Sequence, residues 1–243
     1  IKNVFSEYLK GPNPVFTGTE VHIGTDEYAK KEAEPFRAFT DQLIEHVQSF
    51  GKTVRIWGAL THAAGKTPVR VKNVNMNTWY NGYANPIEMK KLGYPQISTP
   101  DGWVYIVPAA GYYYDYLNYK HLYSKWSPLQ IGDKRFPAGD PNILGGAFAA
   151  WNDIVGNGIS EKDVHDRVFP AMQVLAQKMW GGDQTLTTYE VFDAGRKALG
   201  EGPEVNIRGK IGALSQTPVA TFTKLNFKGA NSFTKTAFTE IGY

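Results

Sequence analysis

The sequence predicts an α/β fold built around a parallel sheet. Three observations lead to this prediction: short β-type runs alternate with helical patterns, helix-length segments separate successive runs, and acidic or aromatic residues follow several of the runs. Strands separated by helices favour parallel pairing through right-handed crossovers. The chain has 243 residues, 42% hydrophobic and 20% charged, so it can bury a sizeable core.

The first elements follow this alternation. Helical spacing across residues 4–9, before the stop signal Gly11-Pro12, predicts that the chain begins inside a helix, as a truncated or processed chain would. Residues 19–23 predict a strand. Residues 34–50 predict a helix whose apolar face is formed by Phe36, Phe39, Leu43 and Val47.

Further strands are expected at residues 53–57, 71–78, 102–107 and 145–151, with a short helix near residues 86–92. With residues 19–23, this gives about five strands. Ser160 and Asp163 resemble a capping box at the start of another helix. The apolar stripe expected on that helix is Val164, Val168, Met172, Leu175 and Met179.

The last quarter of the chain has a different pattern. The residues expected to cap, staple and end one more helix are Thr187 with Glu190, Leu186 with Val191, and Gly200. Residues 201–218 are rich in Gly, Pro and Ser and predict a linker. Short alternating runs in residues 219–243 predict the start of a β-rich module, so the first domain is expected to span residues 1–200.

Composition excludes several classes of protein. The absence of cysteine excludes a disulfide scaffold and thiolate metal sites. Lys and Arg are spread along the chain with a net charge of +3, so no nucleic-acid partner is expected. No apolar run is long enough to span a membrane. Neither a metal nor a cofactor is expected, because His46, His62, His121 and His165 lack ligand spacing and Gly145-Gly146 fits packing better than phosphate binding.

The most informative segment is residues 21–28, VHIGTDEY. A short β-type run ends in Gly24-Thr25, and two adjacent carboxylates, Asp26 and Glu27, come immediately before a helical pattern. Acids at the carboxyl end of a strand lie where α/β folds keep their chemistry. A bare acidic pair at this place is also explained by the dipole of the following helix, so the pair gains weight only from the whole segment.

The segment closely resembles the signature of glycoside hydrolase family 20, the β-N-acetylhexosaminidases, and the resemblance extends from residue 1 to about residue 182. It implies a (β/α)8 TIM barrel. This chain would supply only strands four to eight of that barrel, and the N-terminal half of the barrel would be its partner. It also implies a retaining exo-enzyme that hydrolyses terminal β-linked GlcNAc or GalNAc by substrate-assisted catalysis through an oxazolinium intermediate.

The resemblance also implies roles for individual residues. Glu27 would be the general acid and base, and Asp26 would hold the acetamido group of the substrate. Tyr113, in the run Tyr112 to Asp115, would donate to the acetamido carbonyl, and Asp115 would help to position the sugar. The Trp side chains expected to wall the sugar pocket are Trp57, Trp79 and Trp151.

Three assignments are less direct. Asp153 stands where the family has Glu in a Trp-x-Glu motif, which leaves the gluco-versus-galacto preference open. His22 shares strand parity with Asp26, and either a supporting role in the site or a buried structural role fits it. Trp103 and Trp180 are assigned to packing, and neither Arg55 nor Arg70 is taken as the sugar-binding arginine of the family.

Two other functions are kept open beside the exo-hexosaminidase. One is a lacto-N-biosidase-like enzyme that releases a disaccharide, and the other is a non-catalytic glycan-binding module. The expected partners are β-linked N-acetylhexosamine glycans, and the expected location is secreted or on the surface of a bacterial cell.

Overall fold

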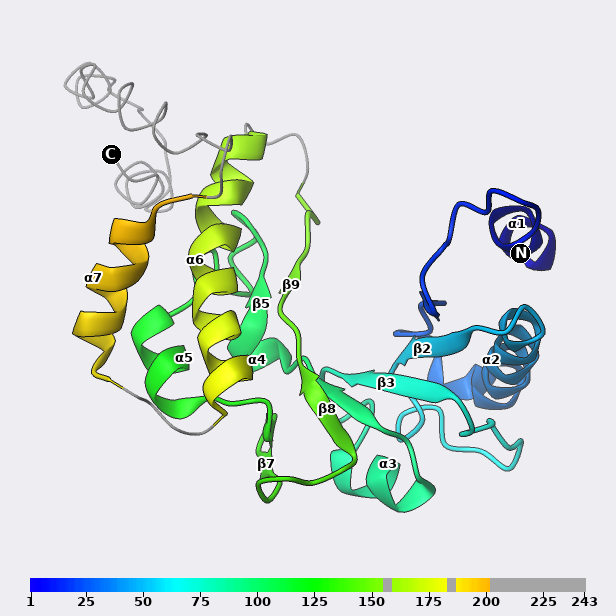
Figure 1. The fold of residues 1–243 in the computed structure, drawn as a ribbon. Helices are drawn as coiled ribbons and strands as arrows, with labels where there is room; N and C mark the ends of the chain where they lie inside the picture. Colours follow the sequence, from blue (N-terminus) through cyan, green and yellow to red (C-terminus); the bar gives the residue numbers. More distant parts are fainter. Residues whose placement is uncertain (155–158, 183–186, 202–243) are drawn as a thin grey trace, which may run out of the picture.

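The structure, a computed structural model, describes residues 1–154, 159–182 and 187–201. In these ranges, five strands form a parallel sheet in the order β1-β2-β3-β4-β8 (Figure 1). Their bounds are Glu20–His22, Thr53–Trp57, Val74–Thr78, Gln96–Ser98 and Ile143–Gly146. Because all neighbours in the sheet run parallel, the carboxyl ends of the five strands lie along one edge.

Two small strand pairs accompany the main sheet. β5 (Tyr105–Ile106) pairs in parallel with β9 (Ala149–Ala150), and β6 (Gln130–Ile131) forms an antiparallel hairpin with β7 (Lys134–Arg135). The short β5–β9 pair continues the chain from β4 and β8, which places Tyr105 and Ala149 beyond the main sheet.

Helices lie at both ends of the molecule. Their bounds are α1 Lys2–Leu9, the 3-10 helix η1 Lys30–Glu32, α2 Ala33–Gln48, α3 Pro86–Leu92, α4 Asp101–Val104, α5 Tyr119–Lys125, α6 Glu161–Gly181 and α7 Tyr189–Leu199. Figure 1 shows α1 and α2 beside β2 at one end, and α5, α6 and α7 packed together at the other. The sheet connects these two helical groups.

The two faces of the first strands carry different side chains. Val21, Val54 and Ile56 are buried in the apolar cluster that includes Phe36 and Val47 of α2. The opposite face is polar and aromatic. His22 pairs in register with Arg55 there, and alternation along β2 places Trp57 on the same face.

A second apolar cluster forms around β5, α5 and α6. Its fully buried members include Ile106, Tyr123, Trp126 and Val174. Gly146 of β8 lies so close to Trp126 that a Cβ on the glycine would come within 2.6 Å of the indole ring. The prediction that Gly145-Gly146 serves packing agrees with this contact.

The strand predicted at residues 102–107 is wrong in its first half. α4 occupies Asp101–Val104 and β5 begins only at Tyr105. Pro100 precedes the helix and the Asp101 carboxylate accepts from the Gly102 N–H, which favours a helical first turn. Trp103 therefore lies on a helix, where its ring stacks on His121.

The strand β4 was not predicted, because its residues do not follow an apolar pattern. Gln96 and Ser98 are fully buried, yet both are hydrogen bonded: Gln96 to Thr78 and Pro86, and Ser98 to the Gln130 carbonyl. The single strand predicted at residues 145–151 is divided into β8 and β9. The main sheet has five strands, as predicted, with β4 as its fourth member instead of residues 102–107.

The positions of the helices agree with the prediction better than the burial of their apolar side chains does. Phe39 is 44% exposed, so the buried face of α2 is narrower than predicted. On α6 the capping box of Ser160 and Asp163 is confirmed, but Met172 and Met179 are exposed. Trp180 does not pack, since it is 91% exposed.

The start of α7 also differs by one residue. Its N-cap is Thr188, whose hydroxyl accepts from the Val191 N–H, and not Thr187. The helix ends before Gly200, as predicted. The staple residue Leu186, the β-rich module and all but the first residue of the linker lie outside the described residues.

Candidate active site

The loop after β1 presents Asp26 and Glu27 through an unusual backbone. The strand pairing of β1 with β2 continues to Gly24, whose carbonyl accepts from the Trp57 N–H at 2.8 Å. Gly24 and Thr25 then both adopt positive φ angles, 80° and 76°. A β-branched residue with this φ is strained, and such strain gathers at functional loops. The Thr25 hydroxyl, which donates to the Gly24 carbonyl, holds this turn.

Five rings form a continuous group beside this loop, which we call the aromatic cluster: Trp57, Trp79, Tyr105, Tyr113 and Trp151. Tyr105 is central to it. Its ring lies 5.7 Å from Trp151, 5.4 Å from Tyr113 and 6.4 Å from Trp79, measured between centroids. Trp57 lies 5.6 Å from Trp151. The structure thus brings together the three predicted Trp residues and the predicted Tyr113.

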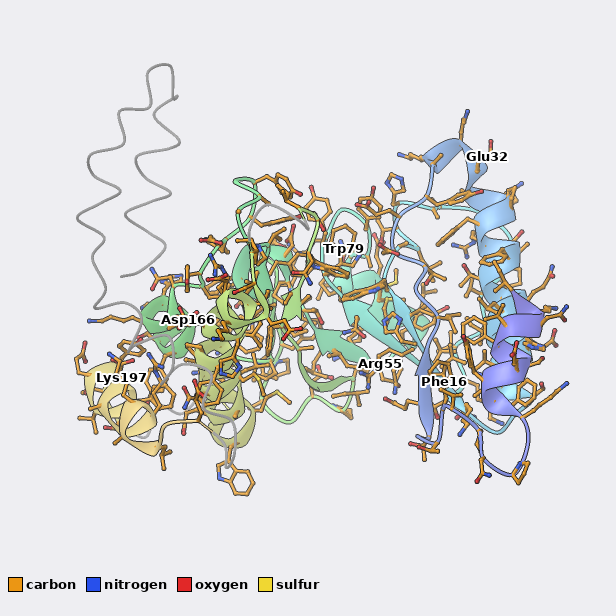
Figure 2. The ribbon with its side chains drawn as sticks, turned by 90° about the horizontal axis from the view of Figure 1, so that it is seen from above. Phe16, Glu32, Arg55, Trp79, Asp166 and Lys197 are labelled. Carbon is orange, nitrogen blue, oxygen red and sulfur yellow. The ribbon has the colours of Figure 1, made fainter. Side chains whose placement is uncertain are left out.

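Trp79 is the most firmly held ring of the aromatic cluster. Its indole N–H donates to the Gly58 carbonyl at 3.0 Å, and the residue is 7% exposed. Gly58 follows β2, and a Cβ there would come within 2.6 Å of Ala84. Figure 2 shows Trp79 between the end of the molecule that carries α2 and the end that carries α6.

The charges of the two acids act on the phenols of the aromatic cluster. Burial raises the pKa of Tyr113 to about 12, together with its hydrogen bond to Asp101, and the Glu27 charge adds to the rise. Burial also raises the pKa of Tyr105, with a contribution from Asp26. Asp26 and Glu27 are themselves exposed. The Tyr113 and Tyr105 phenols therefore stay protonated and able to donate at neutral pH.

Sequence reasoning missed two residues of this region, Tyr105 and Asp101. Tyr105 was expected only as part of a strand, and Asp101 only as an unremarked loop residue. The Tyr113 hydroxyl donates to the Asp101 carboxylate at 3.0 Å. The only sequence signal was the dense aromatic run around residues 103–116.

The remaining predicted acids are already bound by protein groups. Asp153 accepts from the Tyr112 hydroxyl at 2.8 Å. Asp115 accepts from the Ala109 N–H and, at 2.8 and 3.1 Å, from two nitrogens of Arg167, whose side chain is 3% exposed. The structure thus shows a structural partner for Asp115, while its predicted contact with sugar stays a prediction.

His22 lies against the aromatic cluster but is not buried. Its ring is 5.3 Å from Trp57, and its Nδ1 accepts from the Gly24 N–H at 3.0 Å. Partial loss of water around the ring and the nearby Arg55 charge lower the pKa of His22, against the opposing effect of Asp26. The imidazole is therefore neutral at neutral pH, with its proton on Nε2, and it supports the turn that carries the acids.

A cavity of about 510 Å³ borders the acidic loop. Asp26 and Glu27 line it together with apolar residues of α1 and α2, such as Phe5, Phe39 and Leu43. None of the three predicted Trp residues lines this cavity. Of the predicted site residues, Asp26 and Glu27 line this cavity, so its lining differs from that expected of the sugar pocket.

Within residues 1–154, 159–182 and 187–201, no group of three or more His, Asp or Glu side chains could hold a metal ion. No helix in the same ranges is long and apolar enough to cross a membrane.

The sequence model of the glycosyl hydrolase family 20 catalytic domain matches residues 25–183, which begins at the strained Thr25 and includes the whole aromatic cluster. The chain belongs to glycosyl hydrolase family 20. No curated protein sequence gives a significant match. The family match confirms the resemblance that residues 21–28 suggested.

Solved structures of family 20 proteins share the fold of this family 20 chain. The β-N-acetylhexosaminidase from Streptomyces coelicolor A3(2) is 20% identical with a TM-score of 0.60, over 81% of this chain and 40% of that chain. The enzyme from Bacteroides fragilis NCTC 9343 is 20% identical with a TM-score of 0.57, over 75% and 40%. The exo-β-N-acetylglucosaminidase from Vibrio harveyi, solved with N-acetylglucosamine, is 18% identical with a TM-score of 0.59, over 86% and 34%.

These likenesses concern the fold. The chain spans less than half of the length of each of the three proteins. Together with the parallel sheet of five strands, they confirm an α/β barrel of which this chain supplies a part.

Proposed function

We propose that this family 20 chain carries the catalytic acids of a retaining exo-β-N-acetylhexosaminidase, which hydrolyses terminal β-linked GlcNAc or GalNAc from glycans. One observation carries the proposal: the strained Gly24-Thr25 turn presents two adjacent carboxylates beside a continuous cluster of Trp and Tyr rings. Apolar faces of sugars pack well on such rings, and the acids supply the proton transfers that glycoside cleavage needs.

In the proposed mechanism, the substrate provides its own nucleophile. The acetamido carbonyl oxygen attacks C1 and forms an oxazolinium ion while the glycosidic C1–O bond breaks. Glu27 gives its proton to the leaving oxygen, and Asp26 accepts the acetamido N–H and faces the developing positive charge. Glu27 then takes a proton from water as the water oxygen attacks C1, the C1–O bond of the oxazolinium ring breaks, and the acetamido group is restored with retained configuration at C1.

The aromatic cluster has two tasks in this mechanism. Trp57, Trp79 and Trp151 would enclose the sugar and its acetamido methyl group and exclude water from the oxazolinium ion. Tyr113 would donate its hydroxyl proton to the acetamido carbonyl, which orients the oxygen for attack on C1. In the structure this proton points to Asp101, so it must turn towards the substrate.

The test is a comparison of leaving groups in the complete protein. Glu27→Gln should lower kcat/KM about 10²- to 10⁴-fold on natural glycosides, and far less on an activated aryl N-acetylglucosaminide, which needs little protonation. Asp26→Asn should lower both, because it impairs the nucleophile. Glu7→Gln, a change to an exposed carboxylate of α1, is the control and should leave both rates unchanged. Equal losses for Glu27→Gln on both substrates, with chemistry rate-limiting, would contradict the role given to Glu27.

A further inference from the structure

We infer that Asp101 is a positioning residue of the site. It accepts the hydrogen bond of the Tyr113 hydroxyl while the site is empty, and the hydroxyl turns to donate to a substrate carbonyl when one binds. The inference rests on the proposed function for its consequence in catalysis. The contact itself, between the Tyr113 hydroxyl and the Asp101 carboxylate at 3.0 Å, does not depend on that function.

The Asp101 carboxylate is fixed by its surroundings. The backbone N–H of Asp101 donates to the Trp79 carbonyl at 2.9 Å, which ties the residue to the end of β3. Its Oδ1 accepts from the Gly102 N–H at 2.8 Å. Oδ2 is left to accept from Tyr113. A carboxylate held at its backbone and at both oxygens offers a rigid acceptor in one place.

Tyr113 lies on the loop between β5 and α5, and the adjacent Tyr114 carbonyl accepts from the Val107 N–H at 2.8 Å. Ala109 and Gly111 in this loop have positive φ angles, 59° and 79°, and the neighbouring Tyr112 is 61% exposed. The Tyr113 ring packs edge-on against the Tyr105 ring. Among the described residues, the hydrogen bond to Asp101 is the only polar contact of its hydroxyl, so this bond decides where the hydroxyl points.

The Tyr113 hydroxyl has a single proton, so Asp101 determines the direction in which this hydroxyl donates its hydrogen bond. A charged carboxylate only accepts, so in the empty site the Tyr113 proton goes to Asp101. An acetamido carbonyl competes for the same proton, which can change partner by rotation of the hydroxyl alone. Since the ring need not move, Asp101 keeps the donor within reach of the substrate before binding.

Neighbouring charges agree with this arrangement. Burial and the Asp101 hydrogen bond raise the pKa of Tyr113 to about 12, so its proton is retained at working pH. Asp101 also contributes to the raised pKa of Tyr105, after burial, which places its carboxylate near both phenols. Asp101 is thus a third carboxylate beside the aromatic cluster, together with Asp26 and Glu27.

The first arm of the test is a double-mutant cycle in the complete protein, assayed on an aryl N-acetylglucosaminide. Asp101→Ala should lower kcat/KM about ten- to a hundredfold, and Asp101→Asn, which keeps an oxygen and adds a donor to the phenol oxygen, should restore part of it. In a Tyr113→Phe background, Asp101→Ala should add less than about a twofold loss. Equal losses in both backgrounds would overturn the inference, because they would show that Asp101 acts without Tyr113.

The second arm does not need activity. Tyrosines labelled with ¹³C at Cζ report on hydrogen bonds of their hydroxyl groups, and the Tyr113 resonance is identified by its loss in Tyr113→Phe. This resonance should shift in Asp101→Ala. It should stay in place in Asp166→Asn, the matched control, because Asp166 accepts from Tyr116 at the same 3.0 Å away from Trp79 (Figure 2).

An unchanged Tyr113 resonance in Asp101→Ala would overturn the inference whatever the activity. If the wild-type protein cleaves no N-acetylhexosaminide, the proposed function fails, and the resonance still decides whether Asp101 holds Tyr113.

Discussion

Asp115 shows how one carboxylate can have both a predicted role in binding and an observed role in structure. It accepts two hydrogen bonds from Arg167, and the guanidinium also lies 4.5 Å from the Tyr116 ring. Arg167 is almost fully buried. A buried cation needs a charged partner, so the chief effect of Asp115 is expected on stability.

We therefore predict that Asp115→Asn lowers the free energy of unfolding by about 2 kcal/mol, the range for a hydrogen bond to a charged group. Asp153→Asn is the matched comparison, because the hydrogen bond that Asp153 accepts comes from the exposed Tyr112. Its change should be within about 0.5 kcal/mol. Urea denaturation of both variants measures this difference. Equal stabilities would show that Arg167 does not depend on Asp115.

His22 should make stability depend on pH. Its folded-state pKa is lowered from 6.5 to about 4, so folding favours the neutral ring. The stabilisation is fully present above pH 6.5 and is lost as the pH falls through about 4, where the folded protein binds the proton that the unfolded chain already holds.

The variant His22→Gln removes this titration and keeps a polar side chain. The free energy of unfolding of the wild type should fall more steeply between pH 6.5 and 4 than that of His22→Gln. Because the ring is partly exposed, the difference in slope is expected to be modest. Parallel curves from chemical denaturation at several pH values would show that the imidazole does not lose water on folding.

A site residue could be predicted from the sequence where it lies directly at the end of a strand-like run. Asp26 and Glu27 stand together after a strand, and Trp57 and Trp151 each end a strand-like run, so their positions followed from local pattern. Tyr105 and Asp101 could not be found in this way. Their contacts with Tyr113 and Trp79 depend on a short helix and a loop whose path no periodicity records.

At the scale of elements, β8 packs closely because one of its residues is a glycine without a side chain. Gly146 leaves no room for a Cβ, since the nearest atom is the fully buried Trp126 ring at 2.6 Å. Gly195 on α7 is different, because it is exposed in a helix with no atom within 4 Å of its Cβ position. These two glycines form a matched pair.

We predict that Gly146→Ala lowers the free energy of unfolding by about 1–3 kcal/mol, because Trp126 cannot move away. Gly195→Ala should raise it by about 0.5–1 kcal/mol, since alanine restricts the unfolded chain and favours a helix. Thermal and urea unfolding of both variants measure these changes. A neutral Gly146→Ala would mean that the Trp126 ring has freedom that its burial does not suggest.

The sequence predicted elements well where apolar periodicity is present. The bounds of β2 and α3 agree with the predicted ranges, and α6 begins at its predicted capping box. β4 escaped prediction because hydrogen bonds, and not apolar side chains, satisfy its buried residues Gln96 and Ser98. The Gly24-Thr25 turn was not predicted either, because a β-branched threonine rarely adopts a positive φ angle.

At the scale of the whole molecule, the main sheet is open at both ends in the ranges that the structure describes. In the ranges that the structure describes, no strand pairs with the outer edge of β1, the strand that leads to Asp26 and Glu27. The cavity of about 510 Å³ beside the acidic loop is lined mostly by apolar side chains, and Val4 and Phe16 are exposed. An unpaired strand edge beside apolar surface favours association with another polypeptide.

We predict that residues 1–243 alone lack hexosaminidase turnover and aggregate at concentrations where the complete protein stays monodisperse. Asp26 and Glu27 are exposed in the described ranges, so the acids are not shielded from water there as the proposed mechanism requires. The chain spans only 34–40% of the three family 20 proteins compared above, which leaves room for a wall that covers these acids. The measurement is an aryl N-acetylglucosaminide assay with light scattering, after the mass of the chain has been confirmed.

The complete protein assayed in parallel is the control. Comparable turnover in the two samples would show that the open edge of β1 is covered by the chain itself and that the acids need no further wall.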